Sequence, residues 1–287
     1  MKFSVVIVDY ASWPLTMRCI GSLRQAGRKK DLEIVVVDNH PDEPPEPPAG
    51  VRVIRNPENA GFARGCNQGI RAATGELVVL INPDAVVEDE FFDRAESFFA
   101  ENPTAGIAGP RVLDEHGKVQ LSARGEFGPL SGLLGRTSLI TRLFPNSGLV
   151  RNQFPALTRI TEPTEVDWVS GACMISRSEI LQALGGLDER FFMYFEDADL
   201  CRRARETGWL VYYLPGVTIT HSAGGSTGSR PRAIWRLHKS AFLYHRKHGN
   251  RGPLGIYSLL VLAGLSGRTL AKLATSAVDS ISSTKGS

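Results

Sequence analysis

The chain has 287 residues, of which 42% are hydrophobic and 22% are charged, and its formal net charge is only +3. This length suffices for one sizeable α/β domain with a smaller appendage, and the apolar content excludes a largely disordered protein. The four cysteines form no CxxC pair, which excludes a small disulfide scaffold and predicts buried thiols in a reducing compartment.

Targeting signals limit where the protein can reside, and the distribution of charge limits which partners it can bind. No signal peptide precedes the first strand pattern, and the longest apolar run, 254–265, is shorter than the roughly 20 residues that cross a bilayer. We therefore expect a cytoplasmic protein. No acidic residue occurs between Glu206 and Asp279, so this cationic segment favours a phosphorylated ligand or a membrane surface. Its aromatic residues are not regularly interleaved, which argues against nucleic acid.

The first hundred residues alternate between strand and helix patterns. Continuous aliphatic runs, typical of strands covered on both faces, predict strands at 3–8, 32–37, 51–54 and 77–81. Apolar or small residues at helical spacing predict helices after a capping Ser12, at 62–73 and at 89–100. This βαβ alternation predicts an α/β fold with a mostly parallel central sheet.

The pattern loosens after Pro110. Residues 122–164 are rich in Gly, Pro, Ser and Thr, and we interpret them as a long excursion that could form a mobile lid. Order returns at 166–175. Helices are expected from 178, at 197–207 and at 231–248, and a strand is expected at 209–214. We therefore expect one domain over 1–228 and a basic, partly apolar helical tail over 229–287.

Aspartates follow three of the early strands, namely Asp9, Asp38 and Asp84. Ligands of open α/β sheets bind beyond the carboxyl ends of the strands, where carboxylates can contact a nucleobase or sugar or hold a divalent cation. Solvated or helix-capping aspartates are the alternative for each one alone. Asn82-Pro83-Asp84 suits Mg²⁺ that completes its shell with substrate phosphates, although it is also ordinary turn chemistry.

The segment 56–69 runs from a strand end into a helix and combines glycines, asparagines and Arg64. Free N–H groups at a helix N-terminus favour phosphate, and the Arg64 guanidinium offers a fork of donors to a diphosphate. The alternative is an Asn/Gly-rich turn with a surface arginine.

Residues 192–195, which are aromatic except for Met193, lead directly into Glu196, Asp197 and Asp199 at the start of a helix. Apolar surroundings and neighbouring like charges raise the pKa of a carboxyl group, which suits a general base. Helix capping explains only one or two of these acids. His221 precedes a Gly/Ser loop and is interpreted either as a metal ligand or as a structural histidine.

Taken in order, these segments resemble glycosyltransferase family 2, the inverting enzymes of the GT-A fold, and most of all its bacterial rhamnosyltransferase-type members. The resemblance covers roughly residues 3–228, and its specificity comes from the ordered set. It implies a Rossmann-like sheet with a C-terminal helical appendage. The matching segments are SVVIVDY (4–10), VVVDN (35–39), NAGFARGCN (59–67), NPD (82–84), VSGA (169–172) and FEDAD (195–199).

The resemblance also implies roles for matching residues. Asp38 would bind the pyrimidine base of the donor, and Asp84, the last acid of the family's DxD motif, would hold Mg²⁺ or Mn²⁺ together with His221. Asp197, with Glu196 beside it, would deprotonate the acceptor hydroxyl. The expected donor-site set further contains Asp9, Arg64, Asn67 and Asn82. Because Asn82 replaces the first acid of DxD, we expect metal to bind weakly until the donor phosphates arrive.

The implied function is transfer of a sugar, with rhamnose from a deoxythymidine diphosphate donor as the first expectation. The acceptor would be a saccharide or polyprenyl-diphosphate-linked hydroxyl in cell-envelope polysaccharide synthesis. The tail is expected at an anionic membrane surface, or packed onto the domain or a second subunit. The alternative function is a catalytically inactive nucleotide-sugar-binding or scaffolding protein. No GxGxxG follows the first strand, which excludes a typical NAD-dependent enzyme.

Overall fold

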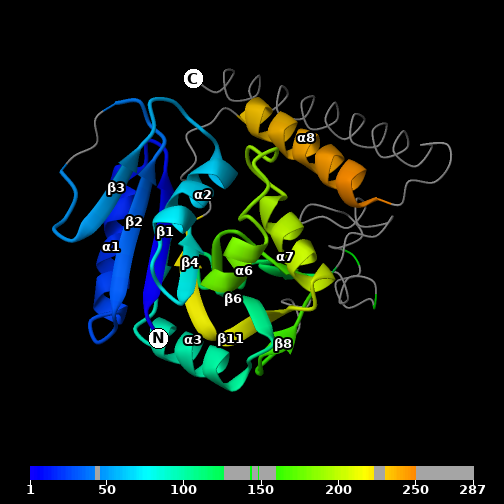
Figure 1. The fold of residues 1–287 in the computed structure, drawn as a ribbon, viewed down its shortest axis with the longest axis horizontal. Helices are drawn as coiled ribbons and strands as arrows, with labels where there is room; N and C mark the ends of the chain where they lie inside the picture. Colours follow the sequence, from blue (N-terminus) through cyan, green and yellow to red (C-terminus); the bar gives the residue numbers. More distant parts are fainter. Residues whose placement is uncertain (43–45, 126–142, 144–147, 149–159, 223–229, 250–287) are drawn as a thin grey trace. The chain divides into compact units, whose positions relative to one another are not determined.

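The computed structural model describes the chain except for residues 43–45, 126–142, 144–147, 149–159, 223–229 and 250–287 (Figure 1). The chain divides into two compact units. The first unit comprises Met1–Asp188 and Glu196–Thr227, and the second comprises Glu189–Phe195 and Gly228–Ser287. Most of the expected excursion 122–164 and all of the apolar run 254–265 lie outside the described residues.

A nine-stranded sheet forms the centre of the first unit, in the order β3-β2-β1-β4-β10-β6-β11-β5, with β8 paired to β11 (Figure 1). Strands β3, β2, β1 and β4 are mutually parallel, β6 and β11 are parallel, and β10 runs antiparallel to both β4 and β6. The strands of this sheet are β1 (Phe3–Asp9), β2 (Leu32–Asp38), β3 (Val51–Arg55), β4 (Leu77–Ile81), β5 (Ala85–Val87), β6 (Ala105–Leu113), β8 (Thr164–Glu165), β10 (Cys173–Arg177) and β11 (Leu210–His221).

Helices cover this sheet, and a second, two-stranded sheet pairs β7 (Ala123–Arg124) with β9 (Trp168–Val169). The helices of the first unit are α1 (Trp13–Ala26), α2 (Phe62–Ala72), α3 (Phe91–Glu101), α6 (Ser178–Ala183) and α7 (Glu196–Glu206). The predicted α/β class and the order of its early elements are therefore confirmed.

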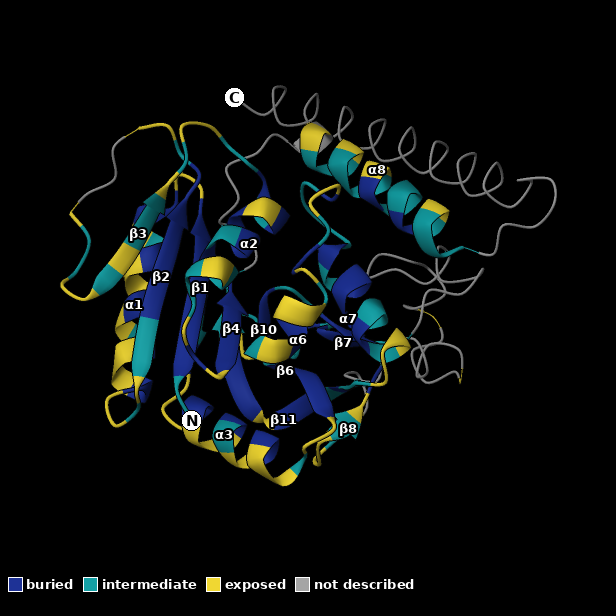
Figure 2. Ribbon diagram, viewed as in Figure 1, coloured by how far each residue is buried: buried dark blue, intermediate teal, exposed yellow. Residues whose placement is uncertain are grey.

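One face of β1 packs in the main hydrophobic core with α1 and α3. Phe3, Val5 and Ile7 belong to this core, and the rings of Phe3 and Phe92 meet edge to face with centroids 4.9 Å apart. Figure 2 shows the resulting dark blue interior along the central strands. The aromatic pattern of α3 therefore anchors the helix to the sheet by burying large rings.

The opposite face of β1 packs against α2, and glycines permit a close approach. A Cβ atom on Gly69 would lie 2.2 Å from Val6 Cγ1, and one on Gly65 would lie 2.8 Å from Val8 Cγ1. Real carbon atoms cannot approach so closely, so these two positions need glycine for packing. The small-residue pattern of this helix thus brings its N-terminus close to the carboxyl edge of the sheet.

Strand β6 is the main element that the sequence pattern does not predict. It contains Gly106, Gly109 and Pro110, which are poor strand formers, but it is buried between β10 and β11. A Cβ on Gly109 would lie 2.5 Å from Val169 Cβ, so the glycine makes room for β9. Strand β11 is also longer than the predicted 209–214, because pairing resumes after a register shift between Leu214 and Thr218.

The second unit contains α8 (Arg230–His248), close to the predicted helix at 231–248. Among the helices that the structure describes, none is both long enough and apolar enough to cross a membrane. The cysteines, all in the first unit, are free and buried, as the sequence predicts, and burial raises the pKa of Cys201 to about 12.

Candidate active site

The carboxyl ends of β2, β1 and β4 lie side by side and carry the predicted strand-end residues. Asp9 is paired in register with Asp38, and Ile81 at the end of β4 is paired with Ile7. Asn82 and Asp84 therefore follow at the same edge of the sheet. Parallel pairing of adjacent strands, which periodicity alone cannot specify, gathers these residues from distant parts of the sequence.

Asp38 has a buried carboxylate with one unused oxygen. Its Oδ1 accepts a 3.0 Å hydrogen bond from the backbone N–H of His40, and Oδ2 has no partner among the described residues. Burial, followed by the nearby charge of Asp9, raises the pKa of this carboxyl group. Tyr10 lies at the same edge, is 43% exposed and contacts the His40 ring edge to face. An unused acceptor next to exposed rings suits a planar ligand that carries an N–H donor.

Asp9, in contrast, is engaged with the start of α1. Its Oδ1 accepts hydrogen bonds of 2.7 Å from Ser12 Oγ and 2.6 Å from Thr16 Oγ1. Ser12 is the N-cap residue of α1, as expected, but its side chain makes no cap hydrogen bond and donates to Asp9 instead. The hydrogen bonds of Asp9 therefore stabilise the local fold, and a contact of Asp9 with the nucleotide-sugar donor remains a prediction.

Asp84, His221 and Asn82 converge where β5 pairs with β11. The antiparallel register sets Ala85 opposite His221, which brings His221 Nε2 to 3.1 Å from Asp84 Oδ1. The Asn82 Nδ2 atom lies 3.2 Å from the same ring nitrogen. Gln120 donates a 2.9 Å hydrogen bond to the backbone oxygen of His221 and so fixes the end of β11.

The donor set of these three side chains fits a divalent cation. If Nε2 carries no proton, it can accept a hydrogen bond from the Asn82 amide, but its lone pair then also faces the Asp84 carboxylate. If Nε2 carries a proton, it can donate to Asp84, but that proton then also faces an N–H group of Asn82. A cation bound by Nε2, Asp84 Oδ1 and the amide oxygen of a flipped Asn82 removes the conflict. The separations of 3.1 and 3.2 Å from His221 Nε2 to the other two side chains would allow all three to hold one cation.

Protein carboxylates alone do not complete such a site. Within the described ranges, no group of three or more His, Cys, Asp or Glu side chains could hold a metal ion. If a metal binds here, Asp84 and His221 would supply two ligands at most, with Asn82 as a neutral third. Mg²⁺ and Mn²⁺ can fill the remaining positions with water and substrate phosphates.

Asp197 lies in the first turn of α7, and both of its carboxylate oxygens accept hydrogen bonds from backbone N–H groups. Gly171 N donates a 2.8 Å hydrogen bond to Oδ2, and Ala198 N donates one of 2.8 Å to Oδ1. Burial raises the pKa of Asp197, and these two bonds and the charge of Arg124 oppose the rise. The net upward shift strengthens the carboxylate as a proton acceptor.

Glu196 lies next to it but in a more secluded position. Its side chain is buried, and Oε2 has no hydrogen-bond partner in the described part of the chain. Burial, reinforced by the charge of Asp197, raises the pKa of Glu196 well above its usual range. Two neighbouring carboxyl groups thus differ in environment, which is how one site can contain a protonated and an ionised acid.

The segment between β9 and β10 forms hydrogen bonds with both Asn82 and Asp197. Gly171 holds Asp197, and the next residue, Ala172, accepts a 3.0 Å hydrogen bond through its oxygen from the backbone N–H of Asn82. The ordered segment expected at 166–175 forms two strands, β9 and β10, and the backbone N–H and C=O groups between them are available for these bonds.

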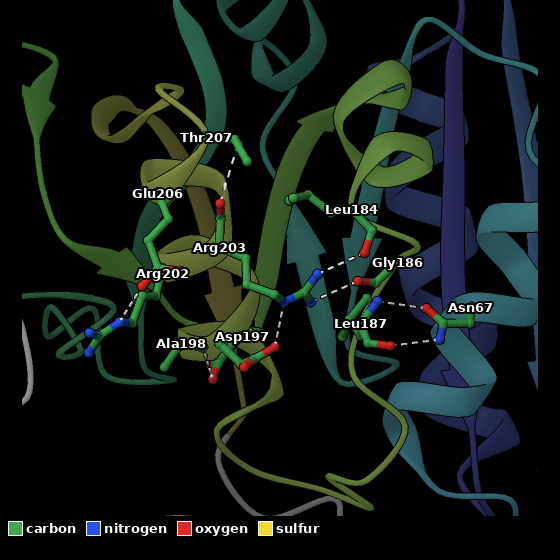
Figure 3. A network of polar contacts seen from close by, with 11 residues as sticks. Asn67, Leu184, Gly186, Leu187, Asp197, Ala198, Arg202, Arg203, Glu206 and Thr207 are labelled. Carbon is green, nitrogen blue, oxygen red and sulfur yellow. Dashed lines mark hydrogen bonds and ion pairs between the residues drawn. The ribbon is translucent and has the colours of Figure 1, made fainter. Parts of the chain in front are cut away.

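Asp199, the third acid of the cluster, is fully buried and stabilises α7. Its Oδ2 accepts a 2.7 Å charged hydrogen bond from Arg203 Nε. Arg203 also donates to the backbone oxygens of Leu184 and Gly186, at 2.9 and 2.8 Å (Figure 3). A helix-terminal position is a common place for such an acid, and its partner shows that the role here is structural.

Two predicted donor-site residues lie on α2 in different surroundings. Asn67 is buried and exchanges two 2.8 Å hydrogen bonds with the backbone of Leu187 (Figure 3), so its amide fixes the loop that precedes α7. Arg64 is exposed in the first turn of the helix. Gly61 adopts φ 88° just before that turn, a conformation for which glycine is suited.

Arg124 and Trp168 were not expected from sequence. Arg124 pairs with Trp168 across β7 and β9, and its guanidinium carbon lies 4.8 Å from the centroid of the indole ring. The charge of Arg124 also acts on Asp197. Arg124 falls at the start of the Gly/Ser-rich stretch 122–164, where no local pattern distinguishes it from a surface arginine.

Comparison with known proteins connects this geometry with a family. A family model described as "Glycosyltransferase like family 2" matches residues 3–251. The N-acetylglucosaminyl-diphospho-decaprenol L-rhamnosyltransferase of Mycobacterium tuberculosis (strain ATCC 25618 / H37Rv) is 30% identical over 262 residues, which cover 84% of this chain and 82% of that protein. The dTDP-rhamnosyl transferase RfbF of Shigella flexneri is 25% identical over 244 residues, 79% of this chain and 74% of its own.

Solved structures support the fold. The mannosyltransferase PcManGT from Pyrobaculum calidifontis, in complex with GDP-Man and Mn²⁺, has a TM-score of 0.57 at 18% identity and covers 98% of this chain and 80% of its own. GalNAc-T7 with UDP, GalNAc and Mn²⁺ has a TM-score of 0.60 at 17% identity. That match covers 91% of this chain but only about half, 54%, of GalNAc-T7.

The sheet, its ligand edge and these matches define a glycosyltransferase of the GT-A fold. The chain belongs to glycosyltransferase-like family 2 and is an enzyme of that class, with rhamnosyltransferases among its relatives.

Proposed function

We propose that this enzyme transfers a sugar, with inversion, from a nucleotide diphosphate donor to an acceptor hydroxyl, and that Asp197 is the base. The observation that carries the proposal is the link through adjacent residues Gly171 and Ala172, which bond to Asp197 and Asn82 respectively. The base would therefore be fixed relative to the side chains expected to face the donor diphosphate.

The chemistry is a single displacement at the anomeric carbon. The acceptor oxygen attacks, its proton passes to Asp197, and the bond to the diphosphate breaks. Asp84, His221 and Asn82 would hold Mg²⁺ or Mn²⁺, which would neutralise charge on the departing diphosphate. Because burial raises the pKa of Glu196 well above its usual range, Glu196 would hold a proton more readily than Asp197 and leave Asp197 as the ionised member of the pair.

The donor base would bind at the ends of β1 and β2. The unused Asp38 Oδ2 offers an acceptor to a pyrimidine N–H, and the exposed Tyr10 ring offers a stacking surface. Arg64 at the N-terminus of α2 would contact the diphosphate. Rhamnose on a deoxythymidine diphosphate is the donor we propose first, because the names of two relatives specify rhamnosyl transfer.

A lipid-linked acceptor is proposed from the same source, since the mycobacterial relative is named for N-acetylglucosaminyl-diphospho-decaprenol. Peripheral membrane contact would bring such an acceptor within reach. One face of α8 supports this, because the exposed residues Arg232, Trp235, Lys239 and Arg246 recur at helical spacing. The domain boundary near 228 remains part of this proposal, with the tail 229–287 as the membrane-facing element.

The direct test is protection of the purified chain against thermal unfolding by nucleotide diphosphate sugars, with and without Mn²⁺ or Mg²⁺. A metal-enhanced shift with one pyrimidine diphosphate sugar is expected and would name the donor for transfer assays. Donor binding without hydrolysis or transfer would favour the alternative of an inactive binding or scaffolding protein. No shift with any donor would contradict the proposal.

A further inference from the structure

One face of α8 contacts the aromatic run just before the acidic pair. Arg236, Ser240 and Tyr244 recur every four residues and therefore share that face. The Arg236 guanidinium carbon lies 4.3 Å from the Phe192 ring centroid, and the rings of Tyr244 and Phe195 lie 5.5 Å apart. Helix α8 and residues 189–195 belong to one compact unit.

The central contact on this face is a buried hydrogen bond. Ser240 is 4% exposed, and its Oγ donates a 2.8 Å bond to the backbone oxygen of Met193. Tyr244 is 5% exposed. A buried hydroxyl and a buried ring thus hold the run at its backbone and at its side chains.

The run held in this way has an unfavourable backbone conformation. Tyr194 and Phe195 adopt φ 73° and φ 69°, a left-handed region that bulky residues seldom occupy. Such conformations persist only where surrounding contacts enforce them. The next residue, Glu196, begins α7, so the direction of the chain at Phe195 sets how the acidic pair enters the helix.

We propose that Ser240 and Tyr244 are positioning residues that hold 192–195 in this conformation and thereby orient the Asp197 carboxylate for proton transfer. This inference rests on the proposed function of Asp197 as base. It gives α8 a second role, because the Arg236-Ser240-Tyr244 face is distinct from the exposed Trp235-Lys239 face.

The test compares full-length Ser240→Ala with Ser97→Ala, which removes an exposed serine on α3, and with Ser240→Thr, which restores a hydroxyl. Ser240→Ala is expected to lower kcat by roughly 10- to 100-fold, as misplacement of a catalytic group does, without change in donor binding. Hydrogen exchange at the N–H groups of Gly171 and Ala198, which bond Asp197, should accelerate. Ser97→Ala should leave both readouts unchanged, and Ser240→Thr should recover part of each.

The exchange measurement keeps the two proposals separable. If the wild-type chain transfers no sugar, the proposed function fails, while faster exchange in Ser240→Ala would still show that α8 positions the acidic pair. Unchanged exchange and unchanged kcat in Ser240→Ala would overturn the inference. Equal losses of kcat, donor binding and thermal stability would also overturn it, because they would show a general structural role.

Discussion

Asn82 and Asp197, far apart in the sequence, bond to the backbone of two adjacent residues. Asn82 N donates to Ala172 O at 3.0 Å, and Gly171 N donates to Asp197 Oδ2 at 2.8 Å. In the proposed mechanism, the relative position of these two residues matters, and the short interruption between β9 and β10 would hold them in place.

Removal of His221 should weaken metal binding. In His221→Ala, the Mn²⁺ concentration that gives half of the maximal nucleotide-dependent thermal protection should rise roughly 10-fold or more, in line with losses at metal sites. His116→Ala, in an exposed turn, is the matched control and should behave as wild type. An unchanged Mn²⁺ requirement in His221→Ala would remove His221 from the metal site.

Glu196 should make stability fall as pH rises. Its pKa is raised in the folded state, so the folded state binds more protons than the unfolded state above the unfolded pKa of about 4.3. The contribution of Glu196 to stability is therefore complete below that pH and is lost as pH rises through the folded pKa. Glu196→Gln should flatten the decline of the unfolding temperature toward alkaline pH.

The control for that experiment is Glu206→Gln, at the exposed end of the same helix. It should retain the wild-type decline with pH. A Glu196→Gln variant whose pH profile matches both wild type and Glu206→Gln would show that Glu196 does not have a raised pKa.

The buried ion pair between Asp199 and Arg203 of α7 should be essential for stability. Arg203→Met removes the partner of a fully buried Asp199 and the donors to Leu184 and Gly186. Loss of one member of a buried pair costs about 3–5 kcal/mol, measured as the free energy of unfolding in urea. Arg202→Met, whose partner Glu206 is 54% exposed, should cost at most about 1 kcal/mol. Equal costs would contradict the buried network.

Close packing of α2 on β1 should depend on Gly69. Gly69→Ala sets a carbon 2.2 Å from Val6 Cγ1, and overpacking of this kind costs about 1–3 kcal/mol. Gly21→Ala, with nothing within 4 Å of the new carbon, should instead stabilise α1 by up to about 1 kcal/mol. Chemical denaturation of the pair provides the comparison, and a neutral Gly69→Ala would argue against this packing.

Local sequence signals predict those parts of the fold in which pattern and environment agree. The aliphatic runs of β1, β2 and β4 are buried on both faces, so continuous hydrophobicity identifies them. Strand β6 is not predicted because Gly109 and Pro110 are poor strand formers. Gly109 is needed for packing, since a side chain there would collide with Val169. Tertiary packing overrides strand propensity at such positions.

The residues of the candidate site likewise divide into those with a local sequence signal and those set by tertiary contacts. Asp38, Asp84 and Asp197 could be proposed from strand ends and from the family motifs, because those signals are contiguous in sequence. The structural contacts of Asn67 with Leu187 and the charge of Arg124 on Asp197 depend on long-range pairing. No local pattern contains that information, so these contacts emerge only from the folded chain.

The most direct test of the account is transfer by Asp197→Asn, assayed with the donor that gives metal-enhanced thermal protection and a polyprenyl-diphosphate-linked saccharide acceptor. Asp89→Asn, an exposed aspartate before α3, serves as control. We predict that Asp197→Asn keeps the donor-dependent thermal shift but loses transfer by about 10²- to 10⁴-fold, the usual contribution of a general base. Wild-type turnover in that variant would contradict Asp197 as the base and, with it, the central claim.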